Sequence, residues 1–110
     1  MLFRSGLSSE ELIQFYEILS HNLTISVRAI WSDEALRDAE KVEQMKWLNE
    51  IMHRVVRKSA ALRMNRNEMS EADTWEMMEG YISLCPSLAS HIAAATISSY
   101  QAVAGFTGAA

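Results

Sequence analysis

Histidines, a cysteine and a row of basic residues are the side chains of this sequence that could carry chemistry. Glu50 and His53 are three apart, which places a carboxylate and an imidazole on one helical face, as in the di-iron sites of helical bundles. Glu17 and His21, four apart, could share a face in the same way. A di-iron site needs a second E-x-x-H helix and two further glutamates, and this sequence has a single E-x-x-H. We therefore expect these four residues on solvated faces, with no metal ion and no other cofactor.

The other reactive side chains, His91 and Cys85, are interpreted as packing residues. His91 lies in a segment without charged residues, where a neutral imidazole can be buried once it has a hydrogen-bond partner. Cys85 is the one cysteine, so no internal disulfide can form, which favours a reducing compartment such as the cytoplasm. The sequence has no serine–histidine–acid pattern and no glycine-rich phosphate loop. No catalytic residue is predicted, and an enzyme is not the favoured interpretation.

Basic residues gather in one part of the sequence. Residues 51–67 contain no acid and five bases, although the whole chain has a net charge of −4. The five bases are Arg54, Arg57, Lys58, Arg63 and Arg66. Bases near the end of a helix complement its dipole, which explains the layout without a ligand. The same residues are the candidate contacts for an anion or for nucleic acid, and the net acidic charge makes nucleic acid the less favoured partner.

Hydrophobic periodicity predicts an all-α fold with no β-sheet. The spacing of apolar side chains predicts four helices, at about 9–31, 39–65, 71–84 and 86–104, joined by short connections in a small antiparallel bundle. Ser8 with Glu11 and Ser70 with Asp73 have capping-box spacing at the starts of the first and third helices. We expect Pro86 to start the fourth helix and Gly105 to stop it. The length suits a single domain, 1–110.

The C-terminal part of the sequence is uncharged. From Gly80 to Ala110 there is no Asp, Glu, Lys or Arg, whereas residues 1–79 carry all 24 of them. The stretch from Pro86 to Phe106 approaches the ~20 residues that cross a membrane. Seven polar side chains interrupt it and no basic cluster flanks it, so we expect no membrane segment. An uncharged helix of this kind is instead expected to be covered by protein.

The predicted fourth helix has small residues four apart, such as Ala94 and Ser98, which let two helix axes approach closely. Its apolar residues lie on more than one side, so a single contact face in a small bundle would leave some of them uncovered. We therefore predict a homodimer through this helix. The predicted interface consists of Leu88, Ile92, Ala95, Ser99, Ala102, Val103 and Phe106.

These features favour a small cytoplasmic helical bundle that acts as a non-catalytic interaction or regulatory protein. It would be a homodimer and would contact a further protein partner, which the sequence does not identify. The alternative is a nucleic-acid-associated regulator that uses the basic end of the second helix. A metal-binding bundle enzyme is the third interpretation.

Overall fold

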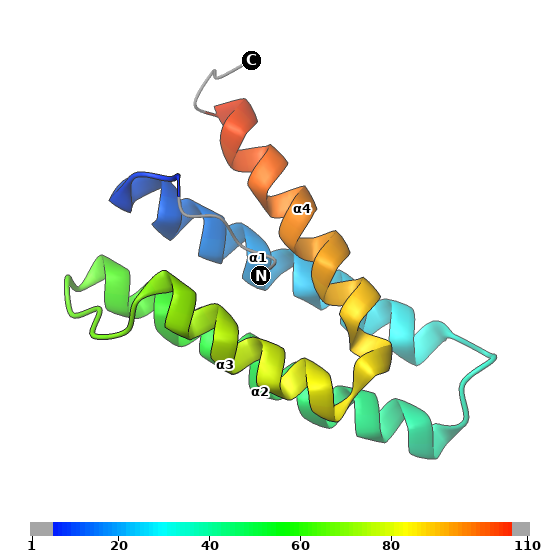
Figure 1. Ribbon diagram of the computed structural model, residues 1–110. Coiled ribbons are helices and arrows are strands. Elements are labelled where there is room, and N and C mark those ends of the chain that lie inside the picture. The colour runs from blue at the N-terminus through cyan, green and yellow to red at the C-terminus, as the bar shows by residue number, and fades with distance from the viewer. Residues whose placement is uncertain (1–5, 107–110) are drawn as a thin grey trace.

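The computed structural model describes residues 6–106, and within that range it consists of helices without a β-strand (Figure 1). The elements are α1 (Ser9–Ser32), α2 (Asp38–Arg63), α3 (Glu71–Leu84), the 3₁₀ turn η1 (Pro86–Leu88) and α4 (Ala89–Phe106). The prediction of a small all-α bundle of four helices is therefore confirmed, and no helix bound differs from the predicted one by more than three residues.

The start of α1 is a capping box, as predicted. Ser8 N–H donates to Glu11 Oε1 over 2.9 Å, and Glu11 N–H donates to Ser8 Oγ over 3.2 Å. At α3 one half of the predicted box forms among the described residues, where Asp73 N–H donates to Ser70 Oγ over 3.1 Å. The Asp73 side chain is one methylene shorter than that of the glutamate in a capping box, which explains why no return bond forms.

The helix α2 ends two residues earlier than predicted because Asn65 adopts a left-handed conformation, with a φ of 55°. Asn65 N–H donates to the carbonyl oxygen of Leu62 over 3.2 Å. Arg66 N–H donates to the carbonyl oxygen of Ala61 over 2.9 Å. The two bonds form a Schellman motif, which satisfies the last carbonyl groups of a helix. Asparagine is the usual substitute for glycine at this position, so Asn65 already lies outside the helix.

The helix α4 begins and ends later than predicted. Pro86 starts the 3₁₀ turn η1, and the regular helix begins at Ala89. Proline suits the first turn of either kind of helix because it has no N–H to satisfy, so its position does not distinguish them. Gly105 lies inside the last turn of α4, which continues to Phe106. A glycine costs a helix only about 1 kcal/mol relative to alanine, and one terminal turn tolerates that cost.

The central element of the bundle is α1. It packs against α2 and against α4, whereas α3 packs mainly on α2. In Figure 1, α2 and α3 run side by side along the lower edge, and α4 rises away from them across α1. The buried ring of Phe15 in α1 lies at the junction. Its centroid is 5.3 Å from that of Tyr16, 6.3 Å from that of Trp75 in α3 and 6.2 Å from that of Tyr100 in α4.

The hydrophobic core is one cluster to which every helix contributes. Most of its members are the apolar residues whose spacing predicted the helices. The largest fully buried side chains are Phe15, Tyr16, Leu19, Leu23, Ile30, Leu48, Ile51, Val55, Trp75, Met78, Leu88 and Ile92. Five of these twelve residues, from Phe15 to Ile30, belong to α1, which is therefore the largest contributor.

Substitution of Asn65 tests the end of α2. We expect Asn65→Ala to lower the free energy of unfolding by about 1 kcal/mol, because a Cβ without a polar group is strained at positive φ. Asn65→Gly relieves that strain and should be at least as stable as the parent protein. Urea unfolding followed by circular dichroism measures both changes. If Asn65→Ala is as stable as Asn65→Gly, the left-handed conformation is wrong.

Candidate functional site

An uncharged groove runs between α1 and α4, which lie antiparallel. It has a volume of about 310 Å³. Small hydroxyl and methyl side chains dominate its walls, and His91 is the one titratable group among its described residues. The lining consists of Asn22, Ile25, Ser26, Ala29, Ser90, His91, Ala94, Ala95 and Ser98. The groove can therefore take an uncharged surface, such as the side of another helix.

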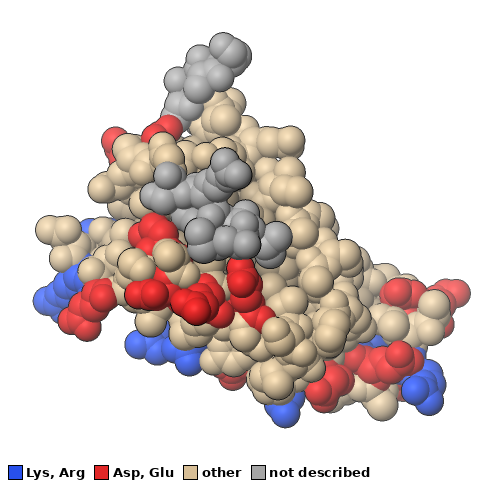
Figure 2. All heavy atoms as spheres, viewed as in Figure 1, with Lys and Arg blue, Asp and Glu red and all other residues tan. Residues whose placement is uncertain are grey.

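The outer surface of α4 continues this groove without charge. Its exposed side chains are Ser90, Ala94, Ile97, Ser98 and Gln101. Ile97 is 58% exposed, and Ile25 on the α1 side of the groove is 56% exposed. On the face drawn in Figure 2, acidic and basic atoms gather along the lower edge, and the surface on the α4 side is almost entirely uncharged. We refer to the groove together with this outer surface of α4 as the α1–α4 face.

The buried hydroxyl groups of α4 find their hydrogen-bond partners within the same chain. Thr96 Oγ1 donates to the carbonyl oxygen of Ile92 over 2.7 Å, and Ser99 Oγ donates to that of Ala95 over 2.6 Å. Ser99 Oγ also accepts from Asn22 Nδ2 over 2.9 Å, which ties α4 to α1. Because both buried hydroxyl groups have partners, their desolvation is compensated. The uncovered part of α4 is its outer side.

The residues predicted to form a dimer interface lie mostly on this inner side. Leu88, Ile92, Ala95, Ser99 and Val103 are buried in the core of the chain itself. Ala102 is half-buried, and the side chain of Phe106 lies outside the described part of the protein. A second copy that packs on α4 would therefore contact the α1–α4 face rather than these side chains. The apolar stripe at these spacings indicated a contact face, and α1 of the same chain occupies it.

The α1 side of the groove was not among the contact surfaces predicted from the sequence. Asn22, Ile25, Ser26 and Ala29 lie beside the main apolar stripe of α1. Ile25 and Ala29 are four apart, and this was the available signal for a second contact strip on that helix.

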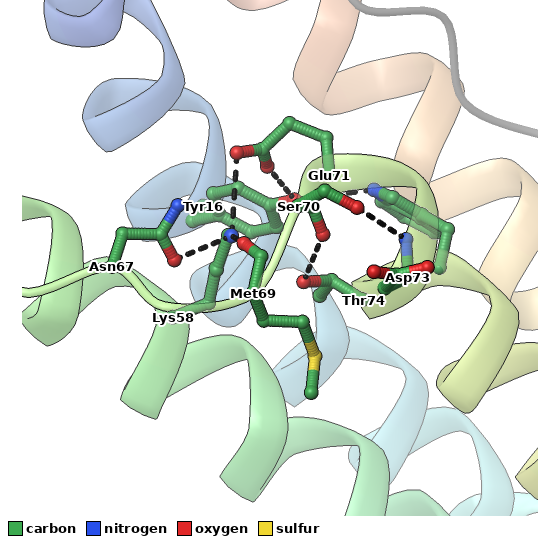
Figure 3. Close-up of polar contacts among 9 residues, drawn as sticks. Tyr16, Lys58, Asn67, Met69, Ser70, Glu71, Asp73 and Thr74 are labelled. Atoms are coloured by element: carbon green, nitrogen blue, oxygen red, sulfur yellow. Dashed lines mark hydrogen bonds and ion pairs between the residues drawn. The ribbon is translucent and has the colours of Figure 1, made fainter.

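Lys58, one of the five predicted anion contacts, is buried, with 5% of its surface exposed. Its Nζ donates to Asn67 Oδ1 over 2.6 Å and to the carbonyl oxygen of Met69 over 2.5 Å. It also forms an ion pair of 3.2 Å with Glu71 Oε1 (Figure 3). The ammonium group is therefore surrounded by acceptors from the protein itself. Lys58 therefore holds the loop 64–70 and the start of α3 against α2.

The Lys58–Glu71 pair extends into the core through Tyr16. The Tyr16 hydroxyl donates to Glu71 Oε2 over 2.8 Å and accepts from Trp75 Nε1 over 3.2 Å. Burial, together with the neighbouring Glu71 carboxylate, raises the pKa of Tyr16 far above its ordinary value of about 10. The hydroxyl therefore keeps its proton at neutral pH and remains a donor. This network joins α1, α2 and α3, and its described polar atoms have partners, so we assign it a structural role.

The other four bases do not form one continuous row. Arg63 forms an ion pair with Glu17, across to α1. Arg54 Nη2 donates to the Tyr81 hydroxyl over 3.2 Å. Arg54, Arg57 and Arg66 line a pocket of about 210 Å³ beside the loop 64–70. Contact with nucleic acid stays a prediction, and these three arginines are the bases that it would use.

The residues considered for a metal site are dispersed. Within the described part of the chain, no three His, Cys, Asp or Glu side chains lie close enough together to hold a metal ion. Glu17, His21, Glu50 and His53, which were expected on solvated faces, are all exposed. Cys85 is buried beside Ser87, with 3.4 Å between Sγ and Oγ.

No protein-family model matches this sequence, and neither a curated protein nor a solved structure is similar to it. Within residues 6–106, every helix falls short of the length or the apolar character that crossing a bilayer demands.

The raised pKa of Tyr16 predicts how stability depends on pH. Above pH 10 the unfolded chain loses the Tyr16 proton while the folded chain keeps it, so the free energy of unfolding falls by about 1.4 kcal/mol per pH unit from this group. Tyr16→Phe should be about 2 kcal/mol less stable at pH 8, because it loses a hydrogen bond to a carboxylate. The difference between the two proteins should then shrink above pH 10. Urea unfolding of both proteins between pH 8 and 11 measures it, and a constant difference would contradict the assignment.

Proposed function

We propose that this chain is a non-catalytic interaction or regulatory protein that acts as a homodimer through the α1–α4 face. The observation that supports it is the one-sided packing of α4, whose helix contacts within the chain are mainly with α1. The opposite side of α4 carries no charge and leaves Ile97 58% exposed, and Ile25 on the α1 side of the groove is 56% exposed. Large apolar side chains on an uncharged surface are typical of a protein contact.

A second copy of the chain fits this face better than an unrelated surface of mixed charge. A two-fold axis would bring the same uncharged surface against itself, so pairing would bury no unpaired charge. Ala94 and Ser98 are small exposed residues four apart, which would admit a close helix, and the exposed Ile25 and Ile97 could pack against the second copy.

The size of the face is consistent with a stable dimer. A standard interface buries about 800 Å² on each partner. The accessible surface of the chain is 6754 Å², so such an interface would cover a modest fraction of it. The helix α4 has 18 residues and is about 27 Å long, which provides much of this area when α1 contributes the other wall.

In such a dimer the charged surfaces of α2 and α3 remain outward. The exposed acids and bases along these helices are then available to a further protein partner, which is the regulatory part of the proposal. A cytoplasmic location belongs to the same proposal and is supported by the single cysteine, which is buried and unpaired.

Light scattering coupled to size-exclusion chromatography tests the dimer. We expect the mass of two chains for the parent protein and of one chain for Ala94→Glu. Ala94 is exposed, so the monomer tolerates the glutamate, whereas a dimer would bury two carboxylates without partners. The dissociation constant should rise at least about 100-fold, which corresponds to about 2.7 kcal/mol.

The matched control is Ala72→Glu, an exposed alanine in the first turn of α3, far from the α1–α4 face. It should remain a dimer. Ala95 is unsuitable for this test because it is buried in the chain's own core, and a glutamate there would unfold the monomer. A monomeric parent protein, or a dimer that survives Ala94→Glu, would refute the proposed interface.

A further inference from the structure

A pocket of about 210 Å³ lies where the end of α2 meets the loop 64–70 and the first half of α3. We propose that this pocket binds a small organic phosphate monoester through Arg54, Arg57 and Arg66. The rest of its lining consists of Lys58, Ala61, Asn67, Glu68, Met69, Thr74 and Met77. The site is separate from the α1–α4 face and does not depend on the dimer.

The phosphate would bind to the arginines, because the ammonium group of Lys58 already contacts acceptors of the protein itself. Lys58 Nζ donates to Asn67 and Met69 and is paired with Glu71. Lys58 is thus a positioning residue that fixes one wall of the pocket (Figure 3). The Schellman motif at the end of α2 fixes the backbone of Arg66 on the same wall. The pocket is therefore formed before a ligand arrives.

The charge of the pocket suits a dianion. The Lys58–Glu71 pair is neutral, so three arginines face one acid, Glu68. A phosphate monoester carries nearly two negative charges above its second pKa, which is about 6. Guanidinium groups bind two phosphate oxygens at once, which gives arginine an advantage over lysine at such a site.

The Asn67 side chain at the pocket has a donor to spare. Its amide accepts from Lys58 through Oδ1, which leaves its NH₂ group to donate elsewhere. A phosphate beside Asn67 supplies the acceptor for this group. Arg54 Nε is buried, so Arg54 would contact the phosphate through its terminal nitrogens.

The remaining wall is apolar and accounts for an organic group on the phosphate. Ala61, Met69 and Met77 line it, and methionine side chains adapt to ligands of different shape. A nucleic-acid strand would need a longer row of free cations. Arg63, the next base along α2, instead pairs with Glu17 of α1. The group of three arginines around one pocket fits one phosphate better than a strand.

Titration of ¹⁵N-labelled protein with phenyl phosphate, at about pH 7.5 so that the probe is a dianion, tests the site. We expect saturable shifts of the Nε–H signals of Arg54, Arg57 and Arg66 and of the backbone signals of Asn67. Arg54→Gln and Arg66→Gln should each raise the dissociation constant at least about tenfold, because each loses a charge-assisted contact. If Arg54→Gln does not fold, Arg57→Gln, an exposed position, provides the same measurement.

Arg63→Gln is the matched control, since Arg63 lies on α2 but does not line the pocket. Its dissociation constant should stay within about twofold of that of the parent protein. An equal loss of affinity in Arg63→Gln would indicate diffuse charge attraction and overturn the proposal. It would also be overturned by shifts that do not saturate up to about 10 mM phenyl phosphate. A DNA oligonucleotide that binds through these arginines while phenyl phosphate has no effect would overturn it in favour of nucleic acid.

Discussion

The ion pair between Lys58 and Glu71 is the interaction on which the arrangement of three helices depends. Removing an ammonium group from water costs several kcal/mol, and the cost is offset only when every hydrogen finds an acceptor. The loop 64–70 can supply two of those acceptors in one conformation, with Asn67 and the Met69 carbonyl group turned toward α2. Glu71 then receives the Tyr16 hydroxyl from α1 as well. A single buried cation thus specifies the course of the loop, the start of α3 and the contact of both with α1.

The attachment of α4 is of a different kind. It has no charged residue, and its described polar contacts to the bundle are made by hydroxyl and amide groups, such as the bond from Asn22 to Ser99. Its apolar inner side packs on α1, with Ile92 and Val103 fully buried. The protein therefore has a region held by a polar network, at α2 and α3, and a region held by close packing of small residues, at α1 and α4. On the face drawn in Figure 2, the surface on the α4 side is almost free of charged atoms.

Local signals in the sequence were sufficient to predict the positions of the helices. The Ser8 capping box and the apolar spacing located α1 to within one residue, because both depend on neighbours in the chain. The signals were ambiguous at Pro86, which suits two kinds of helix. They were also ambiguous at Asn65, because the residue type alone does not show that its backbone is left-handed.

The candidate site was harder to predict than the helices, because it depends on which surfaces the chain itself covers. The stripe containing Ile92 and Ala95 has the pattern of an interface, and periodicity does not reveal that α1 is its partner. Lys58 has the pattern of a solvated base, and only its three distant acceptors explain its burial.

The position of α4 has a consequence for the order of folding. The loop between α1 and α2 is short, so these two helices can pair as soon as both are synthesised. The contact of α4 with α1 joins residues far apart in sequence, as Asn22 and Ser99 are separated by 77 positions. Contacts of such separation form late because a long loop must close first. Until α4 docks, the apolar residues of α1 that it covers remain open to solvent. A chain that has been synthesised only as far as α3 therefore exposes the apolar α1 residues that α4 covers in the folded protein.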